Sequence, residues 1–211
     1  MFYGASCPHC HRTLPIVDRL IKDKHEVIII DDLSTGRSDF INPKAKFIKA
    51  DLVTSQLIDV FKGVDYVFHE AAIPRIQLSL EHPEKTFKAN VYATQRVLQW
   101  SGKQKVKRVI YASSSSVYGQ VNEELGVSRR YLPLREDMPC DPLSPYACQK
   151  YMSEIVCKSY AFNFGLDVIA LRYFNVYGDK MSTTGVYKLV MAIWKEELKQ
   201  NKPMTVYGDG S

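Results

Sequence analysis

Short apolar runs alternate with longer amphipathic segments along most of this chain. The runs are rich in β-branched residues, as in "EVIIID" at 26–31, and they predict strands. Between them, apolar residues recur at three- and four-residue spacing, which predicts helices. We expect strands at 26–31, 46–51, 65–70, 107–113 and 166–174, and helices at 9–23, 54–61, 83–101, 145–164 and 185–200.

Strand and helix in turn are typical of βαβ units, whose strands are parallel and whose sheet is covered by helices on both faces. The fold class that we predict is therefore α/β, with a doubly wound parallel sheet. In such sheets ligands bind outside the carboxyl ends of the strands, so polar residues at strand exits are the first candidates for a site.

The composition narrows the function classes. The chain has 211 residues and 45% hydrophobic content, enough for one domain or one domain with part of another. Its 28 basic and 23 acidic residues are scattered, and we interpret "KQKVKR" at 103–108 as a solvated corner, so we expect no nucleic-acid partner. No apolar run approaches the ~20 residues that span a bilayer and no secretory signal is found, so we expect a cytoplasmic protein with no membrane partner. Five cysteines do not suggest a disulfide framework.

Polar residues stand at three of the predicted strand exits. Asp31 and Asp32 end the strand at 26–31, where an acid either accepts hydrogen bonds from a ribose diol of NAD or caps a tight turn. Asp51 ends the next strand, a position suited to an adenine amino group or to a helix N-cap. The four serines of "YASSSSVYGQ" follow the strand at 107–113, so they are either a polar loop or a set of hydroxyls that touch a ligand.

A tyrosine and a lysine lie four residues apart in "SPYACQKYMSE". On the helix expected at 145–164, this spacing puts Tyr146 and Lys150 on one face. An ammonium group one turn away stabilises a phenolate, which makes the tyrosine a usable base for a sugar hydroxyl. The spacing alone carries little weight, and its context of a hydroxyl-rich strand exit in a dinucleotide-binding fold class makes it a candidate site.

Three motifs in order, "YASSSSVYG", "SPYACQKYMSE" and "ALRYFNVYGD", resemble the extended short-chain dehydrogenase/reductases, in the nucleotide-sugar epimerase and dehydratase branch. The chain looks most like the UDP-glucose 4-epimerases and their N-acetylated-sugar relatives, from about His25 to the last residue. The resemblance implies an NAD-binding Rossmann-like domain at 1–175 and a UDP-sugar substrate. It also implies an incomplete, truncated substrate-binding region at 176–211 and a homodimer formed through the helices at 83–101 and 145–164.

The resemblance also implies roles for individual residues. Tyr146 takes the proton of the sugar 4-hydroxyl during hydride transfer to NAD, Lys150 assists it, and Ser114 is the catalytic hydroxyl. Ser116 lies near the sugar, and Asn175 binds the substrate diphosphate. Residues that line the dinucleotide are Asp31, Asp32, Asp51, Leu52, Ala71, Ala72, Asn90, Tyr146, Lys150 and Tyr173.

The serine run also separates branches of the family. The related 4,6-dehydratases carry Thr-Asp-Glu at this position, and these acids eliminate water from the sugar. Here the sequence is Ser114-Ser115-Ser116, which favours epimerisation or a simple oxidoreduction over dehydration. A nucleotide-sugar dehydratase or reductase remains the alternative within the family.

The first residues depart from the family pattern. Its three-glycine turn falls on Cys7, Cys10 and Thr13, which removes the close backbone approach to the pyrophosphate of NAD. The start "FYGASCPHC" instead resembles a thioredoxin- or glutaredoxin-like chain over about 20 residues. A thiolate at Cys7 would gain from the helix N-terminus what a phosphate gains.

Four interpretations of this segment stay open: a structural or vestigial role, a redox dithiol of Cys7 and Cys10, a metal site that includes His9 and His11, or a c-type haem attachment. Of these four, the metal site is one that we do not expect. Three functions follow: a nucleotide-sugar epimerase, a thiol-disulfide oxidoreductase, or an inactive fragment that keeps the fold.

Overall fold

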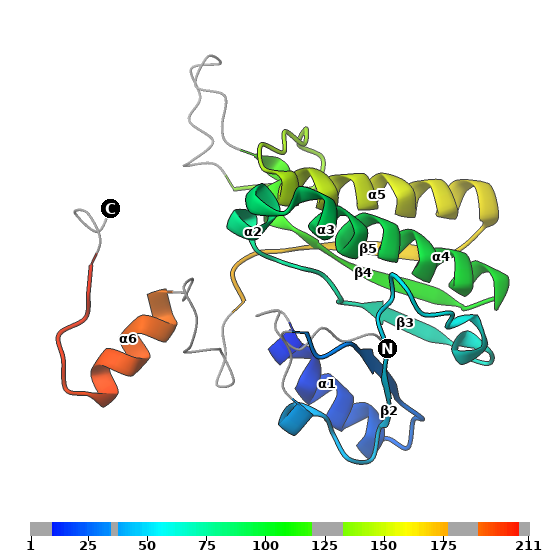
Figure 1. Cartoon of the computed structure of the whole chain (residues 1–211), viewed down its shortest axis with the longest axis horizontal. Coiled ribbons are helices and arrows are strands. Elements are labelled where there is room, and N and C mark those ends of the chain that lie inside the picture. The colour runs from blue at the N-terminus through cyan, green and yellow to red at the C-terminus, as the bar shows by residue number, and fades with distance from the viewer. Residues whose placement is uncertain (1–9, 35–37, 120–132, 177–189, 207–211) are drawn as a thin grey trace. The chain divides into compact units, whose positions relative to one another are not determined.

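The structure is a computed structural model that describes residues 10–34, 38–119, 133–176 and 190–206. The chain divides into two compact units, Met1–Phe174 and Asn175–Ser211, and the sheet lies in the first (Figure 1). The assignment of 1–175 to a cofactor domain and 176–211 to a substrate region stays a prediction. Within the described residues no helix combines the length and apolarity that a membrane span requires.

The described strands are β1 (Ile28–Asp31), β2 (Lys46–Lys49), β3 (Tyr66–His69), β4 (Arg108–Ser114) and β5 (Val168–Tyr173). The α-helices are α1 (Cys10–Lys22), α2 (Ile76–Glu81), α3 (Pro83–Phe87), α4 (Ala93–Lys103), α5 (Pro145–Phe164) and α6 (Val190–Lys199). Shorter helical turns are η1 (Ser38–Phe40), η2 (Ile58–Phe61) and η4 (Ser115–Tyr118), and η3 (Lys88–Tyr92) is a π-helical turn.

The strand pairs in the described residues are all parallel. β1 pairs with β2 from Ile28 opposite Lys46, and β4 lies between β3 and β5 in a three-stranded ladder. Their carboxyl ends therefore share an edge within each ladder. The polar strand exits predicted from the sequence lie at these edges.

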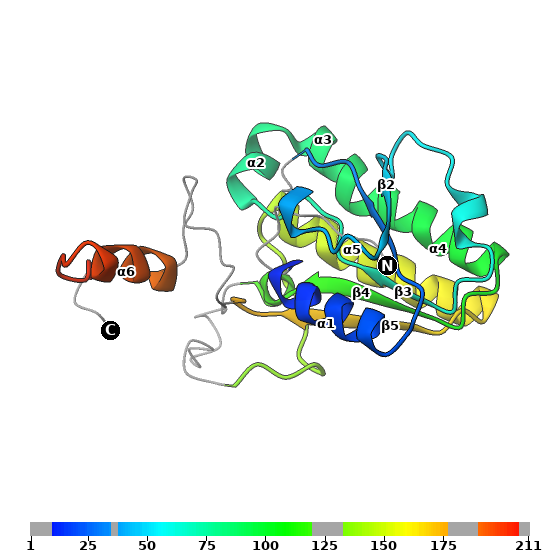
Figure 2. The same cartoon turned by 90° about the horizontal axis from the view of Figure 1, so that it is seen from below.

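Alternate strand residues face two different hydrophobic clusters. Ile30 and Val67 belong to the larger cluster, which includes side chains of α4. Ile29 belongs to the smaller cluster with Val17 of α1, and Phe68 packs against it. Because successive strand residues point to opposite faces, helices cover both faces of the sheet, and α4 and α5 lie side by side on one of them (Figure 2). The predicted doubly wound arrangement is confirmed.

Most of the helices predicted from periodicity are present. α5 coincides with the helix predicted at 145–164, because the Ser144 hydroxyl caps its start by accepting the N–H of Ala147 at 3.1 Å. Gly165, with a φ of 64°, ends it in the left-handed conformation. The helix predicted at 83–101 is α3 and α4 joined by the π turn η3.

The helix predicted at 54–61 is wrong. The segment is a turn after β2 followed by η2 at Ile58–Phe61. The Asp51 carboxylate accepts the N–H of Val53 at 2.7 Å, which closes the turn locally. The carbonyl groups of the turn bond to an arginine on α4 rather than to a following helical turn. No periodicity in the sequence reports such a long-range contact.

Candidate active site

The serine run directly follows β4, at the edge where the sheet opens. The hydroxyl of Ser114 accepts the N–H of Ser116 at 3.2 Å and the hydroxyl of Ser116 at 2.9 Å, so Ser114 caps η4. Ser113 is buried and donates its hydroxyl to the Glu154 carboxylate on α5. Both predicted hydroxyls, Ser114 and Ser116, thus lie together at the strand exit, and their contact with a substrate stays a prediction.

Tyr146 and Lys150 project from the first two turns of α5, and both are at least 95% buried. The Lys150 ammonium lies 6.0 Å from the ring centroid of Tyr146. It donates a hydrogen bond to the carbonyl oxygen of Ala112 at 2.7 Å, two residues before Ser114 on β4. The tyrosine, the lysine and the serine exit therefore belong to one region.

A second phenol lies beside the same ammonium group. The ring centroid of Tyr111 is 5.0 Å from the Lys150 nitrogen, within the range of a cation–π contact. Burial raises the pKa of Tyr111 well above its ordinary value, so this phenol keeps its proton. Tyr146 is thus the better candidate for a base of the two.

His69 lies under the same cluster. Its Nε2 is 2.9 Å from the Thr94 hydroxyl, and its ring is 5.7 Å from that of Tyr111. Burial, together with the charge of Lys150, lowers the pKa of His69 to about 3. The imidazole is therefore neutral at physiological pH and serves the packing around Lys150.

Asn90, predicted to line the dinucleotide, is 1% exposed and joins two elements. Its Oδ1 accepts the N–H of Ile73 at 2.7 Å, and its Nδ2 donates to the Ile73 carbonyl at 3.2 Å and to Gln149 Oε1 at 2.8 Å. The Asn90 carbonyl, in the π turn, accepts the hydroxyls of Thr94 and Ser153. The asparagine thus ties the segment after β3 to α5, next to Lys150.

Ser79 and Gln149 hold the start of α5, and sequence reasoning missed both. The hydroxyl of Ser79 accepts the N–H of Tyr146 at 3.1 Å, and Gln149 donates to the Thr86 hydroxyl at 3.0 Å. Polar side chains on otherwise apolar helix faces were the available signal, because such groups need partners when buried.

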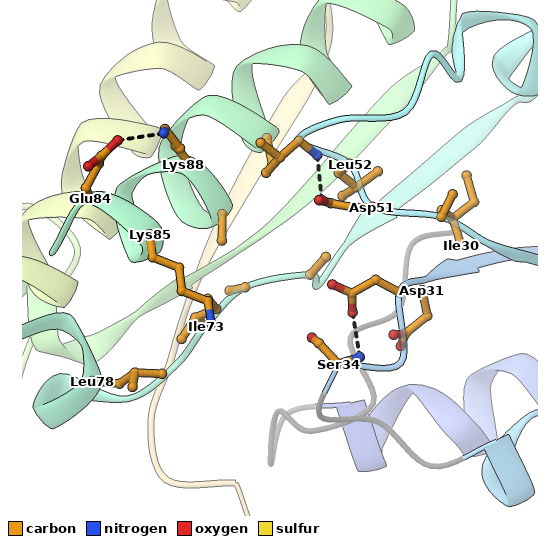
Figure 3. A pocket seen from close by; sticks show the side chains of 17 residues that line it. Ile30, Asp31, Ser34, Asp51, Leu52, Ile73, Leu78, Glu84, Lys85 and Lys88 are labelled. Atoms are coloured by element: carbon orange, nitrogen blue, oxygen red, sulfur yellow. Dashed lines mark hydrogen bonds and ion pairs between the residues drawn. The ribbon is translucent and has the colours of Figure 1, made fainter. Parts of the chain in front are cut away.

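A cavity of about 540 Å³ lies outside the carboxyl ends of β1, β2 and β3. Figure 3 shows Asp31 and Ser34 on one side of it and Leu78 and Lys85 on the other. Its volume is in the range of ligand sites in proteins. Six of the residues predicted to line the dinucleotide line this cavity: Asp31, Asp32, Asp51, Leu52, Ala71 and Ala72.

The acids at this cavity also close turns. Asp31 and Asp32 accept the N–H groups of Leu33 and Ser34 at 2.7 and 2.8 Å. Asp51 accepts the N–H of Val53 and, at 3.3 Å, the hydroxyl of Thr54. The turn-capping interpretation therefore holds for Asp31 and Asp32, whereas Asp51, expected as a helix N-cap, closes a turn instead because no α-helix follows it.

Arg96 on α4 anchors the turn after β2, and sequence reasoning missed it. Its guanidinium donates to the carbonyl oxygens of Leu52 at 2.9 Å and Ser55 at 2.7 Å, and also to that of Val53. Its carbon Cζ lies 4.6 Å from the Trp100 ring centroid, and the residue is 8% exposed. A buried arginine thus sets the position of a cavity wall.

An ion pair joins α5 to β5 behind the serine run. Arg172 donates from Nη2 to Glu154 Oε2 at 2.8 Å and from Nε to Oε1 at 3.0 Å. This pairing raises the pKa of Arg172. The guanidinium also lies 4.6 Å from the Tyr118 ring and bonds to the sulfur of Cys140, so it connects η4 with the segment before α5.

The remaining predicted residues are less informative. Tyr173 ends β5 opposite Ser114, and its hydroxyl donates to Glu70 at 3.3 Å. Asn175 begins the second unit, and its role stays a prediction. Cys10 is the first residue of α1 and Thr13 lies within it, whereas Cys7 lies outside the described residues.

The described part of the chain was searched for metal-binding groups and for disulfide bonds. That part contains no group of three or more His, Cys, Asp or Glu side chains able to hold a metal ion. Its cysteines outside α1, Cys140, Cys148 and Cys157, are free thiols. Burial raises the pKa of Cys157 to about 12, which makes it unreactive.

Comparison with known proteins gives a consistent result. A model of the NAD dependent epimerase/dehydratase family matches residues 15–211. The chain is 37% identical over 199 residues to a Methanocaldococcus jannaschii protein provisionally named UDP-glucose 4-epimerase, covering 93% of this chain and 62% of that protein. It is 34% identical over 205 residues to the UDP-glucose 4-epimerase of Mycolicibacterium smegmatis, with the same two shares. The chain thus spans about three fifths of the length of these relatives.

Solved structures give the same result. The UDP-N-acetylglucosamine 4-epimerase of Methanobrevibacter ruminantium, in complex with UDP-N-acetylmuramic acid, superposes with a TM-score of 0.86 at 32% identity, covering 99% of this chain and 65% of that one. The UDP-glucose 4-epimerase of Thermus thermophilus, in complex with NAD, gives 0.81 at 27%, covering 99% and 66%. These similarities give no support to the alternative of a thiol-disulfide oxidoreductase.

Proposed function

Because the chain belongs to the NAD dependent epimerase/dehydratase family, we propose that it carries out the chemistry of a nucleotide-sugar 4-epimerase, a transient oxidation at C4 of the sugar. The observation that carries the proposal is the Lys150 ammonium group, held by the Ala112 carbonyl at the β4 exit and 6.0 Å from the Tyr146 ring. That arrangement suits proton transfer from an alcohol.

The residues around the cavity fit the adenosine half of NAD. Asp31 and Asp32 line the cavity at the end of β1, where a carboxylate can accept ribose hydroxyls, and the small side chains of Ala71 and Ala72 line it as well. The helix α1 begins at Cys10 and supplies N–H groups for a diphosphate, although Cys7, Cys10 and Thr13 stand where the family has glycines. When bound, NAD supplies the hydride acceptor.

The protein's own residues handle the proton. The Tyr146 phenolate takes the proton of the sugar 4-hydroxyl while the C4 hydrogen leaves as hydride, and the tyrosine returns that proton when C4 is reduced again. Lys150 stabilises the phenolate by its charge. Ser114 donates its hydroxyl to the sugar oxygen. The side chains of Tyr146 and Lys150 are both buried, and this keeps water away from the 4-keto intermediate.

The substrate that we propose is a UDP-sugar, the class bound by the Methanobrevibacter ruminantium relative. Ser116 would contact the sugar and Asn175 the diphosphate. Ser114, Ser115 and Ser116 provide no acid for elimination of water, so an epimerase is favoured over a dehydratase.

We also propose that two copies pair through the outer faces of the helices at 83–101 and 145–164. Large apolar side chains on these faces are exposed, among them Phe87, Tyr92, Ile155 and Phe162. Exposed apolar surface of this kind marks an interface. Sedimentation would show a dimer, and Ile155→Glu would convert it to a monomer. A wild-type monomer at all concentrations would contradict the pairing.

The function is tested by titrating NAD into the protein and then adding UDP-glucose or UDP-N-acetylglucosamine. We expect bound NADH fluorescence to rise and the 4-epimeric sugar to form. Tyr146→Phe should bind NAD as the wild type does and lower turnover by about 10² to 10⁴-fold, since a general base contributes that much. Turnover unchanged in Tyr146→Phe would refute the assignment of the base.

The triple variant Cys7→Gly/Cys10→Gly/Thr13→Gly tests the effect of the three residues that replace the family's glycines. Glycines there should strengthen NAD binding by letting the diphosphate approach the backbone. Equal affinity of both proteins would show that these three positions do not face the diphosphate.

A further inference from the structure

Glu70 is a buried carboxyl for which the proposed mechanism has no use. It directly follows β3 and is 2% exposed. Its Oε1 accepts the Tyr173 hydroxyl at 3.3 Å, whereas its Oε2 is buried without a hydrogen-bond partner. Buried polar atoms are almost always paired, so an orphan acceptor at a strand exit points to a missing donor.

Glu70 lies at the end of the site formed by β4 and α5. The pairing of His69 with Tyr111 sets Glu70 beside Ala112, whose carbonyl holds the Lys150 ammonium. The next residue, Ala71, lines the cavity that suits adenosine. Glu70 therefore adjoins a residue of the cavity wall in the chain and lies within electrostatic reach of Lys150.

The Glu70 carboxyl is close to half-protonated at neutral pH. Burial raises the pKa of Glu70 to about 7, against the opposite effects of Lys150 on α5 and of the Tyr173 hydroxyl on β5. Among the described residues, these two are the titratable groups that act on the carboxyl. Near neutrality the carboxyl can therefore gain or lose its proton in response to a nearby charge.

We propose that Glu70 is a ligand-binding carboxylate at the nicotinamide end of the site, whose free oxygen accepts a hydrogen bond from the bound dinucleotide and whose negative charge favours the oxidised ring over the reduced ring. The inference rests on the proposed function. Its physical basis is that the oxidised nicotinamide ring is cationic and the reduced ring is neutral, so only the oxidised form gains from an ionised neighbour. Glu70 would then select the form of the cofactor that starts the reaction.

The test is calorimetric binding of NAD⁺, NADH and ADP-ribose at about pH 6 and about pH 8. If bound NAD⁺ lowers the pKa of Glu70 by about one unit, NAD⁺ should bind about fivefold more tightly at the higher pH. NADH and ADP-ribose should show no such gain. In Glu70→Gln, which keeps the shape without the charge, the gain for NAD⁺ should disappear, while ADP-ribose affinity stays unchanged.

A matched control removes the same charge elsewhere. Glu26 is exposed, so Glu26→Gln should retain the fivefold gain. If Glu70→Gln also retained the fivefold gain in NAD⁺ affinity, or weakened the binding of ADP-ribose as much as that of NAD⁺, the inference would be overturned. If none of the three ligands bound to the wild type, the proposed cofactor itself would fail, and the inference with it.

An infrared measurement, made first without ligand and then with NAD⁺, guards against misfolding of the variant. The infrared difference spectrum between wild type and Glu70→Gln should contain a protonated-carboxyl band that titrates near pH 7 and moves to lower pH when NAD⁺ is added. Glu70→Asp, which retains the charge, should keep a pH-dependent preference for NAD⁺. A carboxyl band that does not respond to NAD⁺ would refute the contact.

Discussion

At the ends of β1 and β2, the acids Asp31, Asp32 and Asp51 bond to backbone N–H groups two residues further along the chain. At the end of β4, by contrast, Lys150 bonds to the carbonyl of Ala112, 38 residues away, and Tyr146 bonds to Ser79, 67 residues away. The cavity end of the site is thus shaped by local turns. The end with Tyr146 and Lys150, where we propose proton transfer and which we call the proton-transfer end, is shaped by contacts between distant segments.

Substitutions should affect the two ends in different ways. A local turn forms from its own side chains, and the turn after β2 has in addition one anchor from a distant segment, Arg96. A buried cluster of Lys150, His69 and Tyr111 instead depends on every neighbour, because unpaired charge or polarity in an apolar interior is costly. Substitutions at the two ends should therefore separate binding from chemistry.

The largest effect is expected at the proton-transfer end. Lys150→Met should lower turnover by about 10² to 10⁴-fold, since Tyr146 loses the charge that stabilises its phenolate. The melting temperature should fall, because the carbonyl of Ala112 loses its donor, and relief from burying an ammonium group offsets only part of that loss. Single-turnover NADH formation and calorimetric unfolding measure the two effects. A fall in stability with unchanged turnover would contradict the proposed role of Lys150 in the reaction.

A pH effect of up to about 5 kcal/mol should arise from His69 in the same cluster. The pKa of about 3 in the folded protein lies below the ordinary histidine value of 6.5, so between these values the unfolded chain binds the extra proton. The free energy of unfolding should therefore fall as the pH drops from 6.5 toward 3. His69→Asn should remove this part of the slope in urea titrations. An identical slope in the variant would show that the imidazole is not buried neutral.

A smaller effect is expected at the cavity end. Arg96→Met leaves the carbonyls of Leu52, Val53 and Ser55 without their donor and should cost about 2 to 3 kcal/mol of stability. The affinity for ADP-ribose should fall, while turnover at saturating NAD should change little. Arg96→Lys should restore part of both losses. Loss of turnover with unchanged ADP-ribose affinity would contradict the division between the two ends.

The smallest effect concerns the start of α5. Ser144→Ala removes the acceptor of the Ala147 N–H and should cost about 1 kcal/mol, measured by urea unfolding. Ser144→Asp should retain the cap and most of the stability. A loss well above the usual range for a cap would indicate that this residue also positions Tyr146.

The sequence predicted the fold class, the strand exits and the helix at 145–164, and the comparisons with known proteins support the family resemblance drawn from three motifs. These predictions are correct because periodicity, helix caps and short motifs each involve residues that are close together in the sequence. Ser114, Tyr146 and Lys150 were identified in this way, and their catalytic roles await the tests above.

Which strand residues point to opposite faces, and where α5 begins, could be predicted from the amino-acid sequence, since both depend on local geometry. Packing of the folded chain was needed to show that residues 54–61 form no α-helix, that Asn90 binds the segment after β3, and that Glu70 is buried with one oxygen unpaired. Each of these depends on a partner far along the chain, or on the lack of one, and desolvation makes such partners matter only once the chain has packed.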